Sequence, residues 1–80
     1  MRSDERVARQ VGQALRRLRL EENLVLKQVA GPAGITISML SAYEHGHRCP
    51  TVPNLVKVLR ALDCTAEDFG SRLGPWGCLP

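Results

Sequence analysis

The fold is decided by residues 25–46, whose sequence is VLKQVAGPAGITISMLSAYEHG. Apolar residues recur in this stretch at helical spacing, with one interruption. The spacing predicts a short helix over residues 26–33, with Gly34 just past its end. Thr36 is a suitable N-cap for a second helix, over residues 37–45. The stretch is therefore expected to form two short helices joined by a tight turn that contains glycine.

The flanking sequence predicts a long helix before this pair and another helix after it. Ser3 can cap a helix that runs to about Glu22, with an inner stripe formed by Val7, Val11, Ala14, Leu15 and Leu18. Thr51 can cap a later helix that has Pro53 in its first turn, where the missing N–H does no harm. The buried stripe of that helix is expected to consist of Leu55, Val58, Leu59 and Leu62.

A last helix is predicted after Thr65, which together with Asp68 has the pattern of a capping box. This helix should carry Phe69 and Leu73 and end at Gly74. No stretch alternates for long with the period of two that a half-buried strand requires. The expected fold is therefore all-α, with five short helices around one core.

Length, charge and cysteine content bound the class of protein. A chain of 80 residues is one small domain, expected here over residues 1–74 with a short tail at 75–80. The net charge of +3 comes entirely from residues 1–40, so a surface that binds an anion should draw mainly on that half. The three cysteines are Cys49, Cys64 and Cys78. None of them forms a C-x-x-C pair, which argues against a disulfide framework or a zinc finger.

Targeting and catalytic signals are not found in the sequence. The first six residues are mostly charged, and no apolar run approaches the roughly 20 residues that a membrane span needs. We therefore expect a cytoplasmic protein without a membrane partner. No residue pattern indicates a cofactor, and no nucleophile is paired with an oriented base, so an enzyme is not expected.

Several short segments at fixed mutual spacing resemble the Xre/Cro-type helix-turn-helix family of phage and bacterial repressors. They are NLVLKQVA at 23–30, AGIT at 33–36, LS at 40–41, YEHG at 43–46 and PT at 50–51. The segment LVKVLRAL at 55–62, followed by residues 65–69, looks like the last two helices of that family. The resemblance covers about residues 7–73. It implies a lambda-repressor-like fold and a transcriptional regulator that binds operator DNA, usually as a homodimer.

The resemblance implies roles for individual residues as well. The positions that face DNA bases, or lie close enough to contact DNA, are Thr36, Ile37, Ser38, Ser41 and Ala42. Phosphate contacts are implied for Lys27 and Gln28, and for a loop that contains His45, His47 and Arg48. Arg6 and Arg9 are further phosphate candidates, because they are basic and lie near the start of the first helix.

Two structural pairings follow from the same resemblance. Arg19 and Glu44 match a position pair that forms an ion pair between the first and third helices. The last helix and the tail are expected to form a dimer interface through Phe69, Leu73, Trp76 and Leu79, although Trp76 and Leu79 could equally cover the core of one monomer.

The base-facing positions carry unusual chemistry for a DNA reader. Direct readout normally uses Arg, Lys, Gln or Asn, whose paired donors and acceptors match base edges. Here Ile37, Met39 and Ala42 are apolar, and only Ser38 and Ser41 can hydrogen-bond. We therefore expect modest direct readout, with thymine methyl groups as partners of the apolar side chains and with affinity that depends on phosphates and DNA shape.

The segment before the turn also departs from the family pattern. Val25 stands where a Ser or Thr N-cap is common. Pro32 removes an N–H from the predicted helix over residues 26–33, so that helix is expected to be short, kinked or frayed near Gly31.

The sequence favours a homodimeric repressor that inserts residues 37–45 of each subunit into the major groove of a near-palindromic operator. One alternative is an antitoxin-type module that binds a second protein and regulates its own operon. Another is a regulator that responds to a metal or to thiol oxidation, since residues 45–49 read H-x-H-x-C. This segment supplies only three ligands and lies on a turn. We therefore interpret its residues as loop residues that face phosphate, and predict no metal site.

Overall fold

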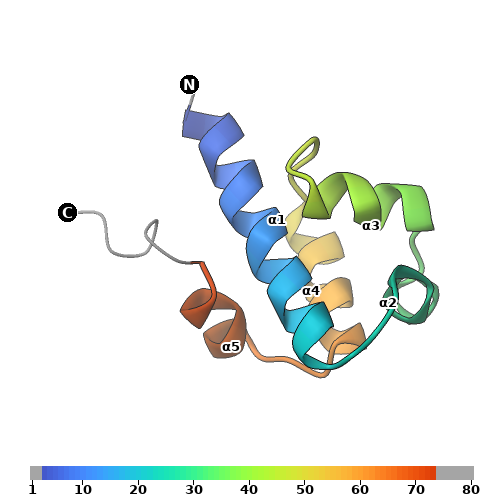
Figure 1. The fold of residues 1–80 in the computed structure, drawn as a ribbon. Coiled ribbons are helices and arrows are strands. Elements are labelled where there is room, and N and C mark those ends of the chain that lie inside the picture. Colours follow the sequence, from blue (N-terminus) through green and yellow to red (C-terminus); the bar gives the residue numbers. More distant parts are fainter. Residues whose placement is uncertain (1–2, 74–80) are drawn as a thin grey trace.

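The computed structural model describes residues 3–73, whose regular structure is five helices and no strand (Figure 1). In chain order they are α1 (Ser3–Glu21), α2 (Leu26–Ala33), α3 (Ile37–Glu44), α4 (Val52–Ala61) and α5 (Ala66–Ser71). The predicted all-α fold with five helices is confirmed. Within the same residues no helix combines the length and the apolar character needed to cross a bilayer.

The long helix α1 separates the other elements, with α3 packed on one side of it and α5 on the other (Figure 1). Its inner face buries Ala8, Ala14, Leu15 and Leu18, whereas Val7 and Val11 are only half-buried. The helix includes Ser3, so the prediction that Ser3 precedes the helix as its cap was wrong.

The hydrophobic core is built from the first four helices and the residue that ends α4. Burying a large apolar side chain contributes about 1.5–3 kcal/mol, and that contribution holds these short helices together. Helix α5 buries no residue completely, and its Phe69 packs against the edge of the core. The core residues are Leu15, Leu18, Val29, Ala30, Ala33, Leu40, Tyr43, Val58, Leu59 and Leu62.

Helix α2 tolerates its proline better than the sequence suggested. Pro32 lies in the last turn, and the helix continues to Ala33 without fraying at Gly31. Because Pro32 is so near the helix end, its missing N–H removes only one late hydrogen bond. Gly34 then adopts a left-handed conformation with φ of 71°, which ends the helix and turns the chain toward α3.

The remaining helix ends follow their side-chain caps. Thr36 Oγ1 accepts a hydrogen bond from the backbone N–H of Met39 (3.0 Å), which starts α3. This helix ends at Glu44, one residue before the predicted end, and His45 is its C-cap. Thr51 Oγ1 accepts from the N–H of Asn54 (3.3 Å) at the start of α4.

Helix α5 begins with the predicted capping box. The carboxylate of Asp68 accepts a hydrogen bond from the Thr65 N–H (3.0 Å), which lowers the pKa of Asp68. The sequence predicted that Leu73 lies within this helix. The helix instead ends at Ser71, and Leu73 lies just beyond it. Helix α5 is thus shorter than predicted.

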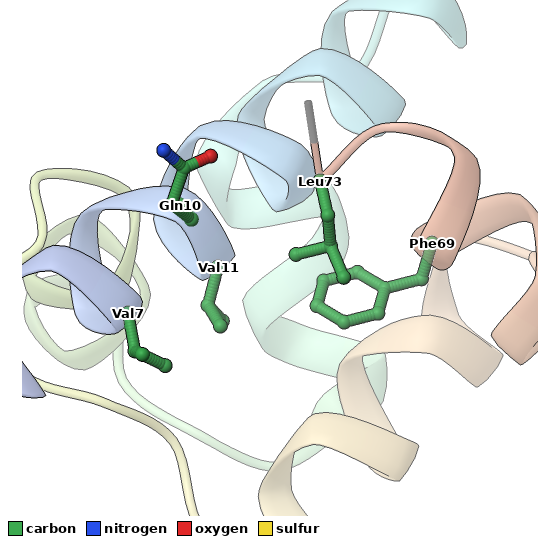
Figure 2. Close-up of a pocket in the computed structure, with 5 residues that line it drawn as sticks. All are labelled: Val7, Gln10, Val11, Phe69 and Leu73. Atoms are coloured by element: carbon green, nitrogen blue, oxygen red, sulfur yellow. The ribbon is translucent and has the colours of Figure 1, made fainter. Parts of the chain in front are cut away.

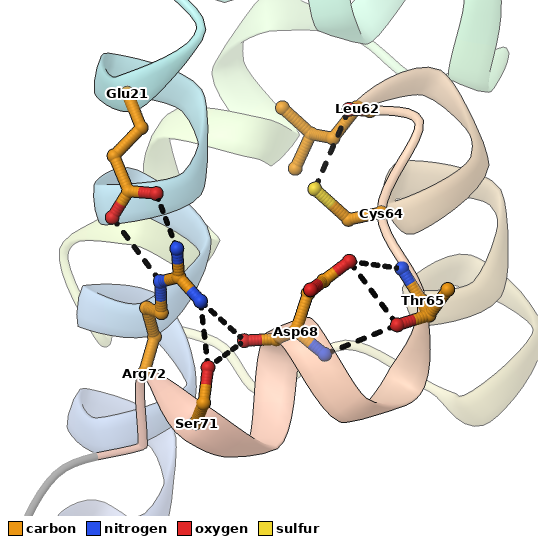
Figure 3. Close-up of polar contacts among 7 residues, drawn as sticks. All are labelled: Glu21, Leu62, Cys64, Thr65, Asp68, Ser71 and Arg72. Carbon is orange, nitrogen blue, oxygen red and sulfur yellow. Dashed lines mark hydrogen bonds and ion pairs between the residues drawn. The ribbon is translucent and has the colours of Figure 1, made fainter.

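A surface ion pair ties the end of α5 to the end of α1. Arg72 donates from Nε to Glu21 Oε2 (3.1 Å) and from Nη2 to Glu21 Oε1 (2.5 Å), as Figure 3 shows. The hydrogen bond from Arg72 lowers the pKa of Glu21. Arg72 also donates to Ser71 Oγ (2.6 Å), so its guanidinium bridges the two helices.

Candidate nucleic-acid interface

Helix α3 presents one face to the core and the other to the exterior. Leu40, Tyr43 and Glu44 are buried. On the opposite face Ile37 is 47% exposed and Ser38 is exposed. Thr36 is exposed, and Ser41 and Ala42 are half-exposed. All five positions that the sequence assigned to base contacts are therefore accessible at the surface.

The outer face of α3 carries short hydroxyls and apolar groups, and no charge. Glu44 is the only charged residue of the helix, and its side chain is turned inward. Ser41 Oγ lies 3.3 Å from His45 Nδ1, and Thr36 Oγ1 is occupied as the helix cap. Ser38 is thus the hydroxyl of this face that is neither a cap nor a partner of another side chain within residues 3–73.

The inner face of α3 is fixed to α1 by a nearly buried ion pair. Arg19 donates from Nε to Glu44 Oε2 (2.7 Å) and from Nη2 to Oε1 (2.9 Å). Its Nη1 also donates to the carbonyl of Leu24 (2.7 Å), in the turn before α2. The bidentate bond to Glu44 raises the pKa of Arg19. One guanidinium therefore joins α1, the following turn and α3.

Two further contacts position α3, and the sequence analysis did not identify them. Gly12 of α1 lies so close to the carbonyl oxygens of Tyr43 and Glu44 that a Cβ atom would overlap them. A glycine inside a long helix signals such a close approach. The amide of Asn54 also donates to the buried Tyr43 hydroxyl (2.9 Å), which links α3 to the first turn of α4.

The loop after α3 lies against the first half of α1. Gly46 adopts φ of 74°, and a Cβ there would lie 2.8 Å from Arg9 Cγ, so this position requires glycine. The contact brings Arg9 alongside the loop that carries His45, His47 and Arg48. Residues far apart in the sequence, Arg9 on α1 and the loop that carries Arg48, thus lie side by side.

All seven residues expected to contact phosphate are exposed. None of the four lysine or arginine residues among them forms an ion pair with another residue in the range 3–73, so their charges face solvent. The seven residues are Arg6, Arg9, Lys27, Gln28, His45, His47 and Arg48.

Gln28 has a structural role that limits how it can bind. Its Oε1 accepts a hydrogen bond from the N–H of Val25 (2.9 Å), which is the half of a capping box that residue N3 supplies, whereas Val25 has no side-chain oxygen to supply the other half. The amide nitrogen of Gln28 remains available as a donor, and a donor is the group that a phosphate oxygen requires.

His45 is also held in a defined orientation. Its Nδ1 lies within hydrogen-bond distance of the carbonyl oxygen of Ser41 (2.8 Å). Its ring stacks on that of His47, with centroids 5.9 Å apart. These contacts fix the ring beside the end of α3.

The cysteine and histidine residues of this region do not assemble into a metal centre within residues 3–73. Cys49 is exposed, in a groove of about 220 Å³ that Glu5 and His47 also line. Cys64 is half-buried, and burial raises the pKa of its thiol. Cys78 lies outside the described residues.

A separate apolar groove of about 140 Å³ lies between α1 and α5. Figure 2 shows Val7 and Val11 of α1 facing the ring of Phe69 and the side chain of Leu73 across it. Gln10 completes the lining. The groove includes both described residues of the expected dimer interface, whereas Trp76 and Leu79 lie outside the described residues.

Comparisons with known proteins agree with this geometry. The helix-turn-helix family model matches residues 15–69, more than half of the chain. The chain is similar to the restriction-modification controller protein C.AhdI from Aeromonas hydrophila, with 29% identity and a TM-score of 0.74 over 78% of this chain and 94% of that one. No curated protein matches the sequence.

Two further solved structures share the fold at lower identity. One is the clp gene regulator ClgR from C. glutamicum, with 23% identity and a TM-score of 0.83 over 92% of this chain and 96% of that one. The other is a point mutant of the restriction-modification controller protein C.Esp1396I, with 19% identity and a TM-score of 0.80 over 86% and 90%. These likenesses confirm the predicted lambda-repressor-like arrangement of helices. The chain belongs to the Xre/Cro-type helix-turn-helix family of DNA-binding transcriptional regulators, which are not enzymes.

Proposed function

We propose that the protein is a homodimeric repressor that inserts α3 of each subunit into successive major grooves of a near-palindromic operator. The observation that carries this proposal is the exposure of Ile37, Ser38 and Ala42 on the outer face of α3. An α-helix with an accessible outer face fits the major groove, and two-fold symmetry then requires half-sites about 34 Å apart.

The exposed basic side chains around α3 support the same mode of binding. Lys27 and Gln28 lie at the start of α2, which precedes α3 in the chain. Arg48 lies in the loop that follows α3, and Arg9 contacts this loop at Gly46. Contacts on both sides of the recognition helix would fix its register on the duplex without reading sequence. Each neutralised phosphate releases counterions, so affinity should fall steeply with salt concentration.

The groove between α1 and α5 supports dimerisation. Helix α5 buries no residue within the monomer, and Phe69 and Leu73 remain half-buried beside Val7 and Val11. A second copy would cover this apolar surface. Repression is favoured because occupation of a promoter is sufficient for it. The likeness to C.AhdI favours a small controller of the restriction-modification type.

The proposal is tested by selecting bound sequences from random duplex DNA with the full chain, together with sedimentation equilibrium. We expect a near-palindromic site and a dimer. Leu73→Asp should shift the protein toward monomer and weaken operator binding, whereas Val52→Asp, at an apolar side chain that is 74% exposed elsewhere, should not. Equal dimerisation of the two variants would contradict the proposed interface.

A further inference from the structure

The outer face of α3 is apolar where a DNA reader usually carries amides or guanidinium groups. Ile37 is 47% exposed, and Ala42 is half-exposed on the same helix. Ile37 is not part of the core, because Leu40 and Tyr43 supply the buried apolar face of α3. Ile37 and Ala42 thus give the outer face of α3 an apolar surface that an apolar group of a bound partner would cover.

The hydrogen-bonding capacity of this face is small. Neither Arg, Lys, Gln nor Asn occurs in α3, so no side chain of the helix can form a bidentate bond to guanine or adenine. The Ser38 hydroxyl is the freest polar group, and a hydroxyl both donates and accepts. It can form one hydrogen bond to a base edge, whereas an amide or guanidinium group can form two.

The major groove offers one apolar group that matches such a surface, the C5-methyl group of thymine. Methylation of cytosine places a methyl group at the same ring carbon. We propose that α3 recognises 5-methylpyrimidines, with Ile37 in contact with the methyl group. This inference rests on the proposed insertion of α3 into the major groove. It implies that, at the contacted positions, thymine binds more tightly than uracil opposite adenine, and 5-methylcytosine binds more tightly than cytosine opposite guanine.

The experiment uses the full chain and the duplex obtained by selection, with one thymine at a time replaced by uracil, cytosine or 5-methylcytosine. Removal of a contacted methyl group by uracil should weaken binding about fourfold. At the same position 5-methylcytosine should bind more tightly than cytosine. Fluorescence anisotropy titrations at one fixed salt concentration measure both effects.

A matched pair of variants assigns the effect to the side chain. Ile37→Ala should bind thymine and uracil duplexes with equal affinity at the contacted position. Leu20→Ala, which shortens an apolar side chain of similar exposure (50%) on α1, should keep the fourfold difference. Circular dichroism should show that both variants retain the wild-type helix content, because both side chains are exposed.

The possible outcomes separate this inference from the proposed function. If every uracil duplex binds within twofold of its thymine parent, while the selected site is still preferred over random DNA, methyl recognition is wrong and the repressor proposal stands. If the methyl effect persists in Ile37→Ala, the assignment to Ile37 is overturned. If no duplex is preferred over any other, both proposals fail, and the apolar face then fits a protein partner.

Discussion

Gly12 of α1 lies directly against the carbonyl oxygen of Tyr43, at the end of the recognition helix α3. This contact lets the two helix backbones approach more closely than any side chain would permit. It therefore helps to set the position of α3 relative to α1.

Gly12→Ala should destabilise the protein by about 1–3 kcal/mol or more, because the new methyl group overlaps backbone atoms that cannot rotate away. Urea denaturation measures the change. Gly70→Ala is the matched control, since a Cβ there meets no atom within 4 Å and alanine favours a helix. Equal stability of the Gly12 variant and the wild type would show that the helices separate without cost.

Glu44→Gln should lower the free energy of unfolding by about 3 kcal/mol, because it leaves the guanidinium of Arg19 without its charged partner. The site is nearly buried, since the side chains of Arg19 and Glu44 are 12% and 4% exposed. The comparison is Glu21→Gln, which breaks the exposed pair with Arg72 and should cost much less. Both values come from urea midpoints. A smaller loss in Glu44→Gln than in Glu21→Gln would contradict a structural role for the Arg19–Glu44 pair.

Acidification should weaken the attachment of α5 to α1. The pKa of Glu21 is lowered from its ordinary value of 4.5 by Arg72, so its contribution is complete above that value and is lost as pH falls through the lowered pKa. Asp68 shifts in the same direction. As the pH is lowered below about 4.5, the melting temperature of the wild type should decrease. This decrease should be smaller in Glu21→Gln than in Glu22→Gln, which is the matched control. Identical pH profiles for the two variants would argue against this linkage.

Arg48→Ala should weaken binding to all DNA sequences alike, since Arg48 is expected to contact phosphate and not bases. The slope of log affinity against log salt should become shallower by about 1. Arg60→Ala removes an equally exposed arginine near the end of α4 and should leave the slope unchanged. A loss that depends on sequence would show that Arg48 reads a base.

Local signals in the sequence predicted most of the fold. Thr36, Thr51 and Thr65 each act as the expected N-cap, because a cap needs only a hydroxyl and the next three residues. The disruption of α2 by Pro32 was overestimated, since the effect of a proline depends on its distance from the helix end. The true end of α5 was missed, because no strong stop signal stands at Ser71.

The parts of the candidate site that the sequence did not predict depend on contacts between distant residues. The approach of Gly46 to Arg9 brings together two segments that we expect to contact phosphate, and nothing local in either segment indicates this approach. The Asn54–Tyr43 hydrogen bond likewise depends on how α3 and α4 pack. The resemblance supplied the exposed positions of α3 and the Arg19–Glu44 pair, whereas the contacts of Gly12 and Asn54 with α3 needed coordinates.

The role of the outer face of α3 is tested most directly by selecting bound DNA with the wild type and with Ser38→Ala in parallel. Ser38 is exposed, so the change should leave the fold intact. The wild type should enrich a near-palindromic site, and Ser38→Ala should lose about 1 kcal/mol of discrimination at one base position in each half-site. Identical base preferences for the two proteins would contradict base contact by Ser38, and no enrichment by either would contradict base contact by this helix.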